Sequence, residues 1–172
     1  MPIDHEPPRC AVTAQVVDVQ HVCREHVRIE LGVADFAASE PGQFLQLLCS
    51  HELDEPERVV EWREGTLPQL GGAAWDDSAT LLRRPFSIAD HWNAADGRTH
   101  LVVISRAVGR GTRWLDALQP GATLDITGPL GRGFRLPADD RPMALIGGGV
   151  GIPPLLYLAR RLHERGHTRA IA

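Results

Sequence analysis

The sequence lacks the features that would place it in a membrane or on nucleic acid. No uninterrupted apolar run approaches the roughly 18 residues needed to cross a bilayer, although 43% of the 172 residues are hydrophobic. Basic residues are not in excess either, because 18 Lys and Arg stand against 22 Asp and Glu for a net charge of -4. Without surplus positive charge, little is available to neutralise a phosphate backbone. We therefore expect no membrane span and no nucleic-acid partner.

Cysteine is also scarce, and its spacing excludes the usual cysteine-built sites. Cys10, Cys23 and Cys49 are odd in number and far apart, with no CxxC pair. They predict neither a disulfide framework nor an iron–sulfur or zinc cluster within this chain. The N-terminal residues, MPIDHEPPRC, lack the basic region and apolar core of a secretory signal. We expect reduced thiols and a cytoplasmic location.

What the first two thirds of the chain does contain is a series of short strand patterns. Apolar residues alternate with polar ones, or form brief apolar runs, and Gly and Pro separate the segments. The six segments are 12–16, 27–31, 44–48, 85–88, 101–108 and 124–126. A hairpin turn is expected at Ala95–Arg98, and a short helix from Thr112, as its N-cap, to Leu118. Six such strands predict a small closed antiparallel barrel.

The sequence pattern changes after Pro137. Met143 to Ile146 predicts a brief buried strand, Gly147 to Gly151 a glycine loop, and the residues that follow a helix capped by Gly166. One face of this helix is apolar, formed by Leu155, Leu158, Ala159 and Leu162. Arg169 to Ala172 begins a following strand. We predict a β-barrel domain over 1–137, with a surface insertion at 51–80, and over 138–172 the N-terminal part of a truncated α/β nucleotide-binding domain.

The glycine loop is the strongest candidate binding site. Gly147, Gly148, Gly149 and Gly151 follow a buried strand and open a helix, where glycines let a pyrophosphate approach the backbone and the helix end offers free N–H groups. The alternative is a tight turn that merely packs the strand against the helix. Pro153 stands where the third glycine of the common dinucleotide pattern is expected, and it suits the first turn of a helix.

Two further motifs are consistent with nucleotide binding. In the first, Arg83-Arg84-Pro85-Phe86-Ser87-Ile88, an arginine can pair with phosphate, an aromatic ring can stack on a flat ring, and a hydroxyl can bond a ring nitrogen. In the second, 106–112, Gly109, Gly111 and Thr112 open the short helix and can expose N–H groups to an anion. A solvated basic pair and a plain capped turn are the respective alternatives.

Four motifs together resemble one family. RRPFSI, RAVGRGT, GPLGRGF and GGGVGIPP occur in the order and at the kind of spacing found in the ferredoxin-NADP reductase superfamily. Within it the chain is most similar to the electron-transfer subunits of bacterial dihydroorotate dehydrogenase and to sulfide dehydrogenase-like reductases. The resemblance implies an FAD-binding Greek-key barrel followed by an NAD(P)H-binding α/β domain.

The resemblance also implies roles for particular residues, all of them cofactor-binding and none catalytic. Arg84, next to Pro85, would hold the FAD pyrophosphate, Phe86 would flank the isoalloxazine and Ser87 would approach its N5. Further contacts to the flavin nucleotide, to phosphate and to the nicotinamide dinucleotide would come from three short segments. These are Ile104, Ser105 and Arg106; Gly109, Gly111 and Thr112; and Gly147, Gly148, Gly149 and Gly151. The cysteine cluster that holds an iron–sulfur centre in the dihydroorotate-type subunits is missing here.

The implied reaction is hydride transfer from NAD(P)H to the flavin, followed by transfer of electrons to a redox partner protein or catalytic subunit. A flavin- or nucleotide-binding module without turnover is the alternative. A third, distant alternative is a zinc hydrolase, because His163-Glu164-Arg165-Gly166-His167 matches the H-E-x-x-H zinc motif. We expect no metal there, because Gly166 breaks the helix that must present both imidazoles.

Overall fold

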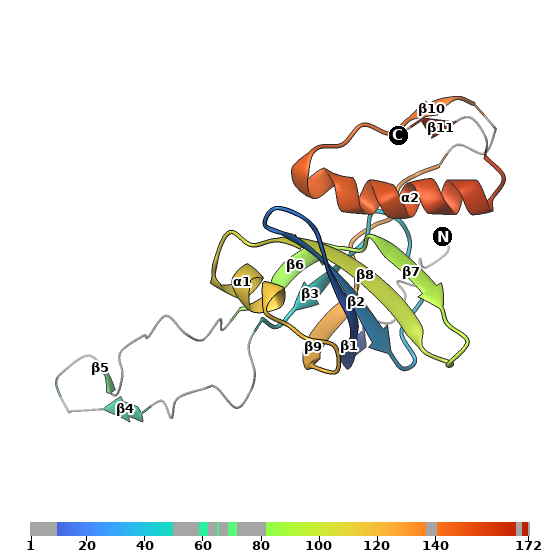
Figure 1. Ribbon diagram of the computed structural model, residues 1–172. Coiled ribbons are helices and arrows are strands. Elements are labelled where there is room, and N and C mark those ends of the chain that lie inside the picture. The colour runs from blue at the N-terminus through green and yellow to red at the C-terminus, as the bar shows by residue number, and fades with distance from the viewer. Residues whose placement is uncertain are drawn as a thin grey trace.

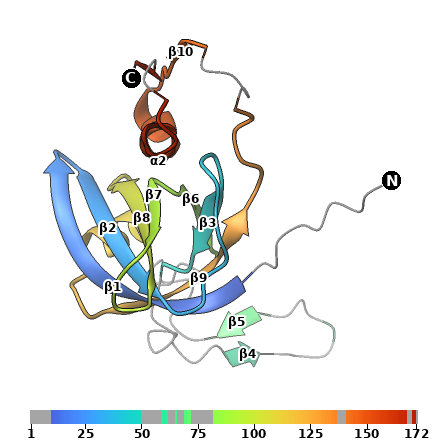
Figure 2. The ribbon, with the colours of Figure 1, turned by 90° about the vertical axis from the view of Figure 1, so that its right-hand side faces the viewer.

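The computed structural model describes residues 10–49, 59–61, 65, 69–71, 82–136, 141–167 and 170–171. Its centre is a seven-stranded antiparallel sheet in the order β6-β3-β9-β1-β2-β8-β7, which curls strongly upon itself (Figures 1 and 2). The strands are β1 (Cys10–Cys23), β2 (His26–Val33), β3 (Phe44–Leu47), β6 (Arg84–Ser87), β7 (Asp90–Asn93), β8 (Thr99–Arg106) and β9 (Thr123–Leu130). A separate short pair joins β4 (Val59–Glu61) to β5 (Gln69–Gly71) within the predicted insertion.

Alternation along the strands builds the core. In β2, Val27, Ile29 and Leu31 are fully buried, and the residues between them lie on the other face. The long strand β1 pairs with β9 through its first half and with β2 through its second. Its register shifts between Val16 and Asp18, and such irregularities bend a strand and let a sheet curl.

The predicted six-stranded closed barrel is wrong in strand number and in closure. The seventh strand, β7, has the sequence DHWN, whose polar character hides it from a hydrophobic pattern. It pairs with β8 through the Ala94–Arg98 hairpin, which includes the predicted turn. Strands β6 and β7 form the two edges of the sheet and do not pair with each other. The expected antiparallel sheet is confirmed, but it remains open.

The short helix α1 (Arg110–Asp116) begins three residues earlier than predicted, and the prediction of Thr112 as its N-cap is wrong. Gly109 is its N-cap, and Thr112 acts from the third helical position by reaching back to the Gly109 backbone. Trp114 and Leu115 pack this helix against the core of the sheet. It therefore follows β8 closely and places the Gly109 turn beside the end of that strand.

The C-terminal segment has the predicted order of strand, glycine loop, helix and strand. Strand β10 (Met143–Ala144) is shorter than predicted and is not buried as predicted, since Ala144 is exposed and Ile146 is 90% exposed. It pairs in parallel with β11 (Ala170–Ile171), and between them lie the 3-10 turn η2 (Gly149–Gly151) and helix α2 (Ile152–Glu164). In both views α2 lies over one end of the curled sheet, above β7. Leu158 and Leu162 of the predicted apolar face are buried, but so is Tyr157.

Two predicted features lie outside the described residues: the domain boundary at 137/138 and most of the insertion at 51–80. Among the helices in the described ranges, none has both the length and the apolar character needed to span a bilayer. The cytoplasmic location stays a prediction.

Candidate functional site

Strand β6 (Arg84–Ser87) and the second half of β8 (residues 103–106) lie side by side without pairing, and the gap between them is called the seam below. The seam brings two of the predicted motifs together. Strand β7 pairs with β8 only through Thr99–Val102, so the second half of β8 is paired on one side alone, with β2. Among the described residues, strand β6 is likewise paired only with β3, and it lies beside β8. The predicted residues 84–87 and 104–106 therefore flank the same unpaired edge, although some twenty residues separate them along the chain.

The connection from β6 to β7 fixes this seam. Ile88 donates its backbone N–H to Gln43 O at 3.1 Å, and Ala89 donates to Val102 O at 2.8 Å. The chain thus crosses from the β3 side of the sheet to the β8 side at one end. Beyond that crossing, the seam remains open to a ligand.

Arg84 and Arg83 have different roles in the structure. Arg83 donates from Nη1 to the backbone oxygen of Asp125 at 3.0 Å, which is a structural bond. Arg84 is exposed, and it makes no hydrogen bond or ion pair to the described residues. A guanidinium that the fold does not use is suited to bind a phosphate.

The buried thiol of Cys49 lies within electrostatic reach of Arg84. Burial raises the pKa of Cys49 to about 11, and the positive charge of Arg84 opposes that rise. The thiol is therefore neutral near pH 7, and a neutral buried thiol is a poor nucleophile. Cys49 belongs to the core rather than to the chemistry of the site.

Phe86, like Ser87 and Ile104, is half-buried, whereas Ser105 is buried. Phe86 pairs with Leu45 across β3 and packs, half-buried, against the core. Ser105 is 2% exposed, opposite the buried Val27, and its Oγ has no hydrogen-bond partner among the described residues. Because side chains alternate along a strand, Ile104 and Arg106 lie on the opposite face of β8 from Ser105.

The turn before α1 is closed by the Thr112 side chain. Its Oγ1 accepts the N–H groups of Val108 and Gly109, both at 2.9 Å, and donates to Gly109 O at 3.0 Å. The hydroxyl is fully used inside the turn. The predicted phosphate contact of Thr112 would therefore come from its backbone, while its side chain shapes the loop.

The glycine loop is open where a ligand would approach. A Cβ added at Gly148, Gly149 or Gly151 would meet no atom within 4 Å, so internal packing does not require glycine there. Gly147 differs, because its Cβ would come within 2.6 Å of Leu155 Cδ1. Gly149 has a φ of 54°, in the left-handed region that favours glycine. One glycine thus serves packing, and the others keep backbone accessible.

A cavity of about 760 Å³ joins the outer face of the sheet to the glycine loop. This volume lies within the roughly 300–1,000 Å³ range of small-molecule sites. Three predicted residues line it: Ile104, Arg106 and Gly149. Sequence reasoning missed the other lining residues, which include Val22, Cys23, His26, Arg28, Ala89, Asp90, Val102, Val150, Ile152, Pro153 and Leu156.

Most of the missed residues belong to elements without a local motif. Cys23 and His26 flank the turn between β1 and β2, and they reach the cavity because β2 pairs with β8. At the same turn Glu25 pairs with Arg106, with Nη2 and Oε2 3.2 Å apart. A strand-pairing prediction would have been needed to find these neighbours.

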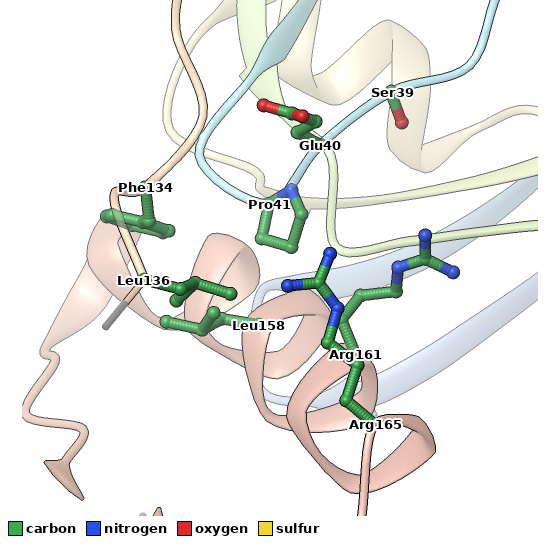
Figure 3. A pocket seen from close by; sticks show the side chains of 8 residues that line it. All are labelled: Ser39, Glu40, Pro41, Phe134, Leu136, Leu158, Arg161 and Arg165. Carbon is green, nitrogen blue, oxygen red and sulfur yellow. The ribbon is translucent and has the colours of Figure 1, made fainter. Parts of the chain in front are cut away.

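A second, smaller cavity of about 260 Å³ lies between α2, the loop before β3 and the segment after β9 (Figure 3). Its lining combines Ser39, Glu40, Pro41, Phe134, Leu136, Leu158, Arg161 and Arg165. None of these residues was predicted as a site residue. Phe134 and Gly133 do fall within the GPLGRGF motif, which therefore packs against the loop before β3.

The H-E-x-x-H match does not lie on one helix. Helix α2 ends at Glu164, and Gly166, with a φ of 75°, turns the chain before His167. Glu164 pairs with Arg160 at 3.0 Å and with Arg161 at 3.1 Å. Within the described residues, no group of three or more His, Cys, Asp or Glu side chains is arranged to hold a metal ion.

The chain is similar to known proteins over most of its length. No family model matches the chain. It is 41% identical over 130 residues to the dihydroorotate dehydrogenase B (NAD(+)) electron transfer subunit of Bacillus velezensis, which covers 74% of this chain and 40% of that subunit. It is 47% identical over 114 residues to the subunit of the same name from Streptococcus pneumoniae, covering 65% of this chain and 42% of that subunit. The chain thus spans about two fifths of the length of these curated relatives.

Solved structures of two reductases have a similar fold. The Amycolatopsis cytochrome P450 reductase GcoB is 32% identical, with a TM-score of 0.64 over 95% of this chain and 42% of that one. The ferredoxin reductase in carbazole 1,9a-dioxygenase shares the fold, with 24% identity and a TM-score of 0.62 over 90% of this chain and 39% of that one.

A curled antiparallel sheet followed by a strand, glycine loop and helix is the fold of ferredoxin-NADP reductase-like proteins. The chain belongs to that superfamily, and within it the chain is homologous to the electron transfer subunits of dihydroorotate dehydrogenase B. The resemblance carried by the four sequence motifs is confirmed.

Proposed function

We propose that this chain binds FAD along the seam between β6 and β8 and passes electrons between NAD(P)H and a partner protein. The observation that carries the proposal is the seam itself. It holds the exposed Arg84 on one strand and Ile104 and Arg106 on the other, and the latter two share a cavity with Gly149. The curated relatives are named electron transfer subunits, which supports a catalytic subunit as the partner.

The described residues fit a flavin dinucleotide. Arg84 offers an unused cation for a pyrophosphate. The turn before α1 is held in a fixed shape by the bonds from the Val108 and Gly109 N–H groups to Thr112, and the Thr112 backbone would make the phosphate contact. The cavity beside β8 is lined largely by apolar side chains, as flat aromatic ligands require. The open glycines at 148, 149 and 151 leave backbone accessible for a second, nicotinamide dinucleotide.

When bound, FAD supplies the redox chemistry, because it can accept a hydride and release electrons singly or in pairs. The protein binds and orients the two nucleotides and limits water at the cavity. The titratable groups that line the cavity include Asp90 and Arg106, and each is held in an ion pair. Because hydride and electron transfer would take place on the cofactor, we assign no acid or base role to a side chain.

Replacing Arg84 tests the FAD site. FAD added to the apo-chain should lose fluorescence and shift its visible spectrum, and Arg84→Ala should weaken this binding. Loss of a charge-assisted bond to phosphate costs roughly 1.5–3 kcal/mol, or about 10- to 150-fold in affinity.

Arg135→Ala is the matched control, because it removes an exposed arginine outside the seam. Its FAD affinity should equal that of the wild type. Equal affinity in Arg84→Ala and Arg135→Ala would refute the assignment of the pyrophosphate to Arg84.

A further inference from the structure

One side chain of α2, Tyr157, is buried against the sheet although it belongs to the nucleotide-binding segment. It is 1% exposed and is the sole tyrosine of the chain. Its hydroxyl donates to the backbone oxygen of Ser39 at 2.8 Å, a bond between residues 118 positions apart. Buried hydroxyls are costly unless bonded, so this bond fixes where the helix can sit.

The same contact extends to β7 through a histidine. Ser39 Oγ lies 2.5 Å from His91 Nδ1, and the His91 and Tyr157 rings stack with their centroids 6.4 Å apart. Burial lowers the pKa of His91, and Arg161 lowers it further, so the ring is neutral near pH 7. Loop, strand and helix thus meet at one polar cluster, in which Ser39 and Tyr157 are buried and His91 is partly buried.

A second contact lies one helical turn further along α2. Arg160 forms an ion pair with Asp90 of β7, and its guanidinium lies 5.3 Å from the centre of the Trp92 ring. Asp90 also lines the large cavity. The two contacts, Tyr157 to Ser39 and Arg160 to Asp90, are called the latch below.

The latch lies beside the walls of the candidate site. Pro153 and Leu156 of α2 line the cavity on one side, while Val102, Ile104 and Arg106 of β8 line it on the other. The cavity therefore exists because α2 is held at this distance from the sheet. Leu156 faces the cavity, and the next residue, Tyr157, is the one that bonds to Ser39.

We infer that Tyr157 is a positioning residue for electron transfer: with Arg160, it holds the glycine loop and α2 against the sheet so that the nicotinamide and the flavin meet in the cavity. The inference rests on the proposed function, because it assumes that FAD binds at the seam. In this inference the latch sets the distance and orientation between the two bound nucleotides. It does not contribute to the affinity for either one. A displacement of about 1 Å between reacting groups is enough to slow a reaction strongly.

Tyr157→Phe separates positioning from binding, because it keeps the ring and removes only the hydroxyl. After the variant is loaded with FAD, reduction of the flavin by NADH is followed in a single turnover over a range of NADH concentrations. We expect the limiting rate to fall about tenfold, equivalent to about 1.4 kcal/mol. The half-saturating NADH concentration and the FAD dissociation constant should stay within about twofold of the wild type, a shift of only about 0.4 kcal/mol.

Arg160→Gln is the second variant, since it breaks the ion pair to Asp90 without touching the core, and it should act in the same direction. Arg165→Ala is the control, because it removes an exposed arginine from the end of α2 outside the latch. Hydrogen exchange of the α2 amides in the apo-chain gives a readout independent of any cofactor. It should quicken in both latch variants and not in the control.

An unchanged limiting rate in folded Tyr157→Phe would overturn the positioning role. A parallel loss of FAD affinity would overturn it too, because Tyr157 would then act on the whole fold. If the wild-type chain bound no FAD, the proposed function would fail and the role in electron transfer with it. Exchange in α2 would still show whether Tyr157 holds the helix, so the two failures are distinguishable.

Discussion

At the scale of single residues, His91 shows how position sets chemistry. Its ring, on β7, is partly buried against α2, where burial first and the charge of Arg161 second lower its pKa below the ordinary value of 6.5, while Asp90 partly opposes the shift. Between the lowered value and 6.5, the unfolded chain binds more protons than the folded one. The contribution of His91 to stability is therefore present above pH 6.5 and is lost as the pH falls.

This gives a prediction for stability against pH. Between pH 7.5 and 5.5, the melting temperature of the wild type should fall more steeply than that of His91→Gln, which cannot take up the proton. His163→Gln, at an exposed position near the end of α2, should keep the wild-type slope. Identical slopes in the wild type and in His91→Gln would show that His91 titrates alike in both states.

Residues with a local signature could be identified from the sequence, and residues defined by distant contacts could not. Arg84, Gly149 and the Gly109 turn lie in short motifs, in which residues adjacent in the sequence indicate the binding chemistry. Tyr157 carries no such signature, because its partner Ser39 is 118 positions away. Helical spacing predicted the apolar face that contains Leu158 and Leu162. It did not predict the contact between Arg160 of α2 and Asp90 of β7.

At the scale of elements, the sequence predicted strands that have one buried face, and it failed where the structure depends on how strands pair. Alternating hydrophobicity found the strands with a buried face, such as β2, because period two is written in the sequence. It missed β7, which is polar, and it could not show that β8 is paired with β7 over half its length. The seam that carries the site follows from that partial pairing.

The start of α1 offers a test at this scale. Thr112→Val removes the hydroxyl that closes the turn, and loss of such a cap costs about 1 kcal/mol. We expect urea unfolding at lower concentration and weaker FAD binding, because the loop that would meet phosphate loses its fixed shape. Thr112→Ser keeps the hydroxyl and should behave as the wild type; equal behaviour of the Val and Ser variants would contradict this role.

At the scale of the whole molecule, the two proposed nucleotide sites differ in how much buried structure the described residues place around them. The seam is formed by a seven-stranded sheet with a continuous buried core. The glycine loop follows a two-residue strand, and Ile146 and Val150 beside it are about nine-tenths exposed. In nucleotide-binding α/β folds, later strands supply the ribose contacts. Residues 1–172 should therefore bind FAD far better than NAD(P)H and should reduce ferricyanide with NAD(P)H only slowly.

The rate of that reaction separates an electron-transfer chain from a passive binding module. Slow but measurable reduction that requires bound FAD fits the proposed function, and none at all fits a module without turnover. Turnover at the rates of ordinary enzymes, about 1–1,000 per second, would show that the described nucleotide segment is sufficient by itself.

The most direct test of the central claim is a titration of FAD into the wild-type apo-chain, followed by visible absorbance and flavin fluorescence. The account predicts a saturable spectral shift that ends at one FAD per chain. An unaltered flavin spectrum at every ratio of folded chain to FAD would contradict it.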